Sequence, residues 1–207
     1  MGEATPEALI ARKRSLGGLR RAAAECRGCS LWRDATQVVF GEGPETARLM
    51  LVGEVPGDLE DRQGHPFVGP AGGLLRRALS ESGIEPAEIY MTNAVKHFKW
   101  EARGKRRIHQ TPSKLEVEAC RPWLEAELGR VEPEGVGLLG ATAAKALLGP
   151  SFKVSKQRGE LLEVDFAAYA VASFHPSAIL RGPEEDRRTA FADLVSDLEL
   201  LRVGRDG

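Results

Sequence analysis

Soft metal ligands are rare in this sequence, and two of them have the spacing of a chelating pair. Two residues separate Cys26 from Cys29, so both thiolates can face one metal centre. Alone, such a pair is equally compatible with redox chemistry or with no chemistry. A four-ligand site would also need Cys120, the last of the three cysteines, and His97, which could otherwise be a solvated loop residue. Because these positions are far apart in sequence, they favour an iron–sulfur cluster joining separate parts of a domain over a compact zinc module.

Three polar side chains that suit acid–base or hydrogen-bonding chemistry each follow a short apolar run. Glu54, Asn93 and His175 come at the ends of three such runs. If the runs are parallel strands, the three side chains lie at the carboxyl edge of the sheet, where open α/β sheets bind their ligands. Taken alone, Asn93 is typical of a turn, and a histidine before proline is often a loop residue.

A basic run, Lys105-Arg106-Arg107-Ile108-His109, is the remaining chemical feature. The net charge of the chain is −1, so any binding to nucleic acid has to use a local patch such as this one. The run could be a solvated loop that contacts phosphates, or it could carry a nucleophilic imidazole in His109.

The elements that would position these residues are those of a single α/β domain over residues 1–207. The 42% hydrophobic and 29% charged residues are ordinary for a globular protein. Apolar runs alternate with helical patterns, which predicts a three-layer domain with a central parallel sheet of about four strands and helices on both faces. Strands are expected at 48–53, 88–94, 136–140 and 170–174. Helices are expected at 7–25, 70–82, 113–128, 141–148 and 184–202, an inserted hairpin at 152–164, and a basic loop at 101–112.

We expect a cytoplasmic protein without disulfides. The segment from Met1 to Ile10 has two acidic residues and a proline but no apolar region, so it does not read as a secretory signal. No apolar stretch reaches the length of a membrane span, so no membrane association is expected. Three cysteines do not pair off evenly, and cytosolic thiols stay reduced. Nothing in the sequence suggests an obligate protein partner.

Several of these segments together resemble the motifs of the iron–sulfur uracil-DNA glycosylases of family 4, and the resemblance runs from about residue 26 to residue 191. The matching segments, in chain order, are GEVPGD at 53–58, HPFVGPAG at 65–72, TN at 92–93 and HPS at 175–177. The resemblance implies a [4Fe–4S] cluster bound by Cys26, Cys29 and Cys120, with His97 in place of the family's remaining cysteine.

Within that family, His97 and the KRRIH run at 105–109 are most similar to the UdgX type, which captures its DNA product covalently through a histidine. The resemblance therefore implies that His109 attacks the sugar C1′ after uracil has left and forms a bond that does not readily hydrolyse. Val55 departs from the pattern, because the UdgX type usually has glutamine there and valine makes no hydrogen bond.

The resemblance also implies roles in the uracil site. Phe67 would stack on the extruded base, contributing on the order of 1–3 kcal/mol. Asn93 would distinguish uracil from cytosine by hydrogen-bond polarity, and His175 would donate to the uracil O2 as negative charge develops. Glu54 would stabilise the sugar cation or orient a nucleophile. Gly53 would let the backbone approach the base, beside Val55.

Uracil-containing DNA, single-stranded in preference, is the implied partner. Arg107 is expected to support catalysis by anchoring the His109 loop or a phosphate through a forked contact. Lys105, Arg106 and Ser177 are expected to contact DNA.

Three other functions stay open from the sequence. In an ordinary hydrolytic uracil-DNA glycosylase, Glu54 would position water and His109 would be a bystander. A non-catalytic, metal-stapled DNA-binding protein would bind without releasing a base. A nucleotide-binding protein using the glycine-rich turn at 53–57 is disfavoured, because Pro56 interrupts the turn and no Lys-Ser/Thr follows.

Overall fold

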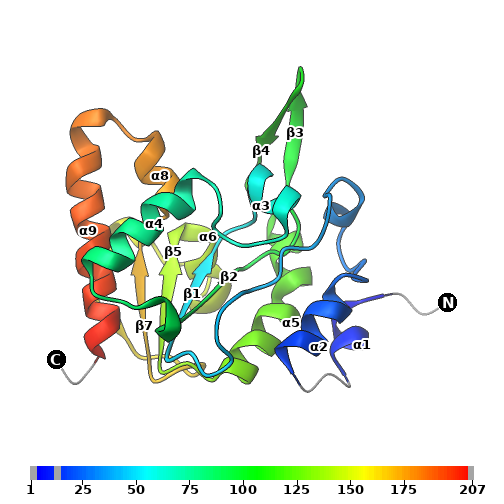
Figure 1. Cartoon of the computed structure of the whole chain (residues 1–207), viewed down its shortest axis with the longest axis horizontal. Helices are drawn as coiled ribbons and strands as arrows, with labels where there is room; N and C mark the ends of the chain where they lie inside the picture. Colours follow the sequence, from blue (N-terminus) through cyan, green and yellow to red (C-terminus); the bar gives the residue numbers. More distant parts are fainter. Residues whose placement is uncertain (1–3, 12–14, 205–207) are drawn as a thin grey trace.

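A five-stranded sheet forms the centre of the molecule in the computed structural model, which describes residues 4–11 and 15–204 (Figure 1). The strand order is β2-β1-β5-β7-β6. The four parallel strands are β1 (Leu49–Gly53), β2 (Ile89–Asn93), β5 (Gly135–Leu139) and β7 (Tyr169–Ser173). Nearly every residue of these strands is buried, as expected for parallel strands covered on both faces. The predicted four-stranded parallel sheet is confirmed, and it gains an antiparallel edge strand, β6 (Leu161–Leu162).

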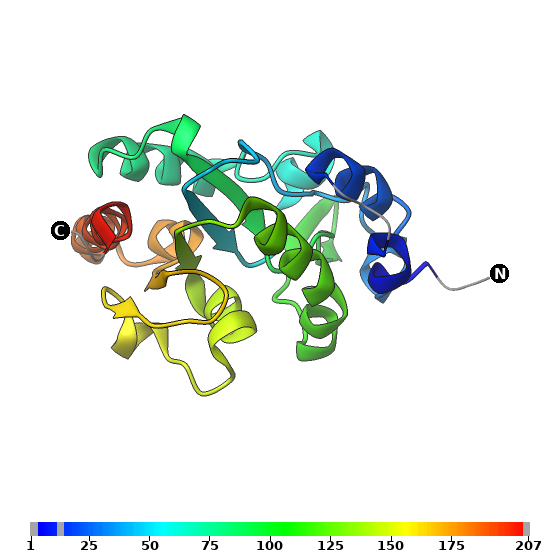
Figure 2. The ribbon, with the colours of Figure 1, turned by 90° about the horizontal axis from the view of Figure 1, so that it is seen from below.

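Helices cover both faces of the sheet and complete the three layers (Figures 1 and 2). Met50 and Val52 point into the core under the helices of one face, and Leu49 and Leu51 into the core under those of the other. The first face carries α1 (Pro6–Ile10), α2 (Leu16–Ala23), α5 (Lys114–Val131), α6 (Gly140–Leu148) and α7 (Val154–Gln157). The second carries α4 (Pro70–Glu81), α8 (Pro176–Arg181) and α9 (Glu184–Val203). Within the described ranges, no helix is long and apolar enough to cross a membrane.

Local sequence signals set the ends of several helices. Ser113 and Glu116 form a reciprocal capping box at the start of α5, which satisfies two backbone N–H groups that have no partner in the helix. Pro70 and Pro176 stand at the first helical positions of α4 and α8, where a missing N–H costs nothing. The short helix α3 (Asp58–Gln63) ends at Gly64, whose φ of 79° is the left-handed conformation typical of a helix C-terminus.

The basic segment at 101–112 was expected to be a loop, and this expectation is wrong for most of it. Strands β3 (Trp100–Arg103) and β4 (Arg106–His109) form an antiparallel hairpin that projects from the carboxyl edge of the central sheet (Figure 1). Gly104 has a φ of 61°, the conformation that the first residue of a two-residue type II′ hairpin turn requires. The hairpin fixes the direction of His109, which ends β4.

Two further expectations need correction. The helix predicted over 7–25 is two helices, α1 and α2, and its part at 12–14 lies outside the described residues, as does 1–3 of the N-terminal segment. The segment 152–164 does not pair with itself as a hairpin. It forms α7, a turn with Gly159 at φ 70°, and β6, which pairs with β7 and not with its own segment. The short helices α3 and α8 were not predicted.

Candidate active site

A cavity of about 340 Å³ opens at the carboxyl edge of the sheet. It brings together residues from four distant parts of the chain: the segment after β1, the end of β2, the hairpin, and the segment after β7. Its wall includes residues expected from the sequence to bind uracil, to act in catalysis or to contact DNA, namely Val55, Phe67, Asn93, His109, His175 and Ser177. The sheet topology thus positions the site as parallel α/β folds generally do.

The ring of Phe67 is held in the cavity by a strained backbone. Phe67 has a φ of 55°, which is rare for a residue with a bulky side chain and occurs mainly where surrounding contacts enforce it. Arg76 donates a hydrogen bond of 2.8 Å to the Phe67 carbonyl, and Gly72 lies so close to that carbonyl that any Cβ would collide with it. The Phe67 ring lies 6.4 Å from the His175 ring, at an interplanar angle of 28°. The cavity therefore offers a flat aromatic wall for a planar ligand.

Asn93 lies at the end of β2 with its side chain at the cavity and an exposed fraction of 3%. Gly53, its partner in the register of β1 and β2, leaves the space that the Asn93 amide oxygen occupies. A Cβ at position 53 would also stand 2.7 Å from the Phe67 ring. Gly53 therefore acts through the absence of a side chain. Val55 is buried and contributes an apolar surface to the same wall.

His175 carries a neutral imidazole whose tautomer is set by its neighbour. The Ser177 backbone N–H donates to His175 Nδ1 at 3.2 Å, and the Ser177 hydroxyl lies 2.7 Å from the same nitrogen. Because Nδ1 accepts the backbone N–H, the ring proton belongs on Nε2, which is then a hydrogen-bond donor. Burial lowers the pKa of His175 to about 4, helped by the nearby charges of Arg181 and His109. Ser177, expected to contact DNA, thus also orients His175.

His109 is the last residue of β4, at the end away from the hairpin turn, and it lines the cavity. Its ring lies 6.1 Å from that of Phe98. His109 as a whole residue is exposed, but its partial burial at the cavity lowers its pKa, and Glu54 opposes this by favouring the protonated form. Glu54 itself lines an adjoining cavity of about 420 Å³, which shares His175 with the first one. The carboxylate and the two imidazoles therefore surround the same region.

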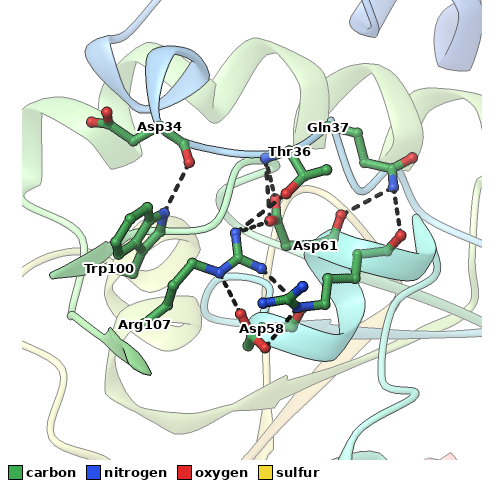
Figure 3. Close-up of polar contacts among 8 residues, drawn as sticks. Asp34, Thr36, Gln37, Asp58, Asp61, Trp100 and Arg107 are labelled. Carbon is green, nitrogen blue, oxygen red and sulfur yellow. Dashed lines mark hydrogen bonds and ion pairs between the residues drawn. The ribbon is translucent and has the colours of Figure 1, made fainter. Parts of the chain in front are cut away.

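Arg107 does not line the cavity, although it was expected among the catalytic residues. Its guanidinium pairs with Asp58 at 2.5 Å and with Asp61 at 2.6 Å, and it donates to the Thr36 hydroxyl at 3.2 Å (Figure 3). The ring nitrogen of Trp100 on the opposite strand donates to a backbone carbonyl in the same region (Figure 3). These contacts fasten the hairpin to α3 and to the segment at 34–36. Two carboxylates of α3 thus occupy the guanidinium, and Arg107 anchors the hairpin that carries His109, which is one of the two roles expected for it.

The other basic residues of the hairpin lie outside the cavity. Lys105 and Arg106 are exposed at the hairpin turn. Three exposed cations that the sequence reasoning missed, Lys145, Lys153 and Arg181, line the adjoining cavity, and Arg181 also lines the first one. No local pattern connects these three, because they come from α6, the segment before α7, and α8.

The candidate metal ligands gather between α2 and α5. The Trp123 ring nitrogen donates to Cys26 Sγ at 3.3 Å, and Trp123 follows Cys120 by one helical turn on α5. The charges of Cys26 and Cys29 both act on Cys120. Burial raises the pKa of Cys120 to about 12 and also raises that of Cys29. Both thiols therefore favour the protonated form, and a bound cation would favour the thiolates.

His97 lies next to this group and carries a neutral ring. The backbone N–H of the preceding residue, Lys96, donates to Cys120 Sγ at 3.2 Å, and the charge of Arg27, between the two N-terminal cysteines, acts on His97. Burial lowers the pKa of His97 to about 4, so the ring is in the form that binds metals. In the described part of the chain, no three His, Cys, Asp or Glu side chains are close enough to hold one metal ion.

Fold and site together define a three-layer α/β protein with a cavity at the carboxyl edge of its parallel strands, lined by an aromatic ring, an amide and two imidazoles. The chain belongs to the uracil DNA glycosylase superfamily, whose model matches residues 40–199. It is 36% identical over 172 residues to a type-4 uracil-DNA glycosylase of Thermotoga maritima, covering 82% of this chain and 86% of that protein. It is also 36% identical over 165 residues to the type-4 enzyme of Pyrobaculum aerophilum (76% and 81% covered), and 33% identical over 177 residues to that of Archaeoglobus fulgidus (82% and 85% covered).

Proposed function

We propose that this chain removes uracil from DNA by cleaving the bond between the base and the sugar. The observation that carries the proposal is the cavity wall itself, where an amide, a planar ring and a neutral imidazole donor converge. Membership of the uracil DNA glycosylase superfamily, with type-4 relatives at up to 36% identity, supports the same reaction.

Base recognition follows from the polarity of the Asn93 amide. Its NH₂ group can donate to the uracil O4 and its oxygen can accept from N3–H, whereas cytosine presents the opposite polarity at both positions. Phe67 supplies the stacking face. Because the base must leave the stack to enter the cavity, single-stranded DNA is the preferred substrate.

Cleavage breaks the bond between C1′ and N1, and its electron pair goes to the base. The Nε2–H of neutral His175 donates to the uracil O2 as negative charge builds there. Positive charge develops on the sugar at the same time, and the carboxylate of Glu54 stabilises it. In the hydrolytic reaction, a water molecule held by Glu54 then attacks C1′ and gives up a proton, leaving an abasic site. The type-4 relatives support this outcome.

A uracil-containing single-stranded oligonucleotide tests this proposal. After incubation and hot alkali, strand breakage at the uracil position is expected with the wild-type protein and not with His175→Ala/Glu54→Ala. Intact strands with unimpaired binding would instead identify a non-catalytic DNA-binding protein.

Covalent capture of the DNA by His109 is the second candidate, and the position of His109 favours it. The ring lines the same cavity as Asn93 and His175, and burial favours its neutral, nucleophilic form. In this reaction an imidazole nitrogen, and not water, bonds to C1′, and the other ring nitrogen then releases its proton to the nearby carboxylate of Glu54 or to water. Val55 contributes no hydrogen bond to this step.

A denaturing gel after boiling in SDS separates the two outcomes. Capture predicts a slowly migrating protein–DNA band that is lost in His109→Ala, and hydrolysis predicts free DNA that breaks in alkali. His65→Ala, which removes a histidine that pairs with Glu42 outside the cavity, is the matched control.

An iron–sulfur cluster is proposed at Cys26, Cys29, Cys120 and His97. The resemblance to the family 4 enzymes and the proximity of Cys26 and Cys29 to Cys120 support it. Lys96, next to His97 in the chain, donates its backbone N–H to Cys120 Sγ, so the four positions bring together the segment after α2, α5 and the segment after β2. When bound, such a cluster cross-links these parts of the domain. Iron analysis and visible absorbance of freshly purified protein test it, against zinc analysis for the alternative.

A further inference from the structure

A buried ion pair between Lys96 and Glu127 contacts the backbone of Asn93. The side chains of Lys96 and Glu127 are 1% and 0% exposed, and their charged groups are in contact. Burying two charges costs several kcal/mol per ion in general, and an apolar pair of the same size is often equally stable. The reaction as derived above uses neither residue.

Every proton of the Lys96 ammonium has an acceptor. It donates to the Thr92 hydroxyl at 2.6 Å, to the backbone carbonyl of Asn93 at 2.7 Å, and to the Glu127 carboxylate. Asn93 is the last residue of β2, so the ammonium fixes the peptide group between Asn93 and Ala94. That peptide sets the direction of the Asn93 side chain.

Glu127 is anchored in turn by three groups from two other segments, the one that contains Gly41 and strand β2. Its carboxylate accepts hydrogen bonds from the Gly41 backbone N–H at 2.9 Å and from the hydroxyls of Tyr90 and Thr92 at 3.0 Å. Glu127 therefore fixes the ammonium to helix α5, and the ammonium fixes the end of β2.

The segment after Asn93 is also tied to β1. The N–H of Ala94 donates to the Gly53 carbonyl at 2.9 Å, and that of Val95 to the Glu54 carbonyl at 3.0 Å. Both acceptors belong to residues of the candidate site. The buried pair therefore supports Asn93 and, through two backbone hydrogen bonds, the turn that carries Glu54.

We infer that Lys96 and Glu127 are positioning residues, which hold the Asn93 amide in the orientation that reads the base. This inference rests on the proposed function, because it assigns to the pair the selectivity of the same cavity. Neither residue can touch DNA, since both are buried.

The double variant Lys96→Met/Glu127→Gln is the main test. It removes both charges at once, so that no unpaired charge is left in the core, and the new amide keeps an acceptor for Gly41, Tyr90 and Thr92. We expect the single-turnover rate of uracil release to fall by about tenfold or more, because a small misplacement of a reacting group has effects of this order or larger. Affinity for uracil-free single-stranded DNA should not change.

Thr92 provides a milder pair of variants, of which Val keeps the side-chain volume and Ser removes only one methyl group. Thr92→Val removes the hydroxyl shared by Lys96 and Glu127, and Thr92→Ser keeps it. We expect Val to slow uracil release and Ser to restore most of the rate. Equal rates in both would overturn the inference.

Hydrogen exchange gives a readout that does not depend on catalysis. In the double variant, the amides of Ala94 and Val95 should exchange faster than in the wild type, while those of α9 should not. Inactive wild-type protein would count against the proposed function alone. A double variant with wild-type rate and wild-type exchange at these amides would overturn the inference alone.

Discussion

The guanidinium of Arg107, on the hairpin, pairs at 2.6 Å with the carboxylate of Asp61, on helix α3, whose side chain is fully buried (Figure 3). This contact joins two segments that each contribute one wall of the cavity. His109, two residues after Arg107 on the same strand, therefore depends on it for its place.

Removing the ion pair between Arg107 and Asp61 should destabilise the protein. Arg107→Ala leaves the Asp61 carboxylate with only the Thr36 N–H as a donor, and we expect the free energy of unfolding to fall by about 1–3 kcal/mol. Urea unfolding followed by circular dichroism measures this. Arg106→Ala, at the exposed neighbour, should change it by less than about 0.5 kcal/mol. Equal effects of the two substitutions would show that the Arg107 contacts contribute no stability.

Loss of the imidazole donor should slow chemistry more than binding. We expect His175→Ala to reduce the single-turnover rate of uracil release by roughly 10²–10³, the usual effect of removing a donor to a developing anion. His65→Ala, whose ring pairs with Glu42 outside the cavity, is the control. A reduction of less than about threefold for His175→Ala would remove His175 from the mechanism.

The pH dependence of the same reaction tests the protonation state of His175. Burial lowers its pKa to about 4, so the neutral donor is present above that pH and is lost as the pH falls through it. The ratio of wild-type to His175→Asn rates should therefore be constant between about pH 5.5 and 8. If the ratio instead declines as the pH falls, with a midpoint near 6.5, the ordinary pKa of histidine, the assignment is contradicted.

Cations at the adjoining cavity should contact the DNA backbone. Lys153→Ala should weaken binding to single-stranded DNA and reduce the slope of log affinity against log salt by about 0.7. Arg202→Ala, near the end of α9 and beside the start of β1 at the opposite edge of the sheet, should leave the slope unchanged. An unchanged slope in Lys153→Ala would exclude a phosphate contact at this residue.

The parallel sheet could be predicted from the sequence, whereas the hairpin could not. Strands such as 49–53 are continuous buried apolar runs, so their type is visible in composition alone. The strands Trp100–Arg103 and Arg106–His109 are mostly exposed and lack an apolar face, so their alternation gives no signal. Gly104 before Lys105 was the one available indication of a turn.

The positions of the site residues could be predicted from the sequence, but the ion pairs and hydrogen bonds that hold them could not. Asn93 and His175 could be placed in one crevice because parallel strands end at one edge. The partners of Arg107 lie 46 and 49 residues away, and Glu127 lies 31 residues from Lys96. Such pairs follow from tertiary packing, and no local spacing reveals them.

Release of the free base is the most direct test of the central claim. Wild-type protein would be incubated with equal amounts of single-stranded oligonucleotides that differ only in one uracil or cytosine, and the released base measured by chromatography. Both hydrolysis and capture by His109 predict free uracil from the first oligonucleotide and no base from the second. Absence of free uracil, from protein with its iron content measured and its binding to the oligonucleotide intact, would contradict the account.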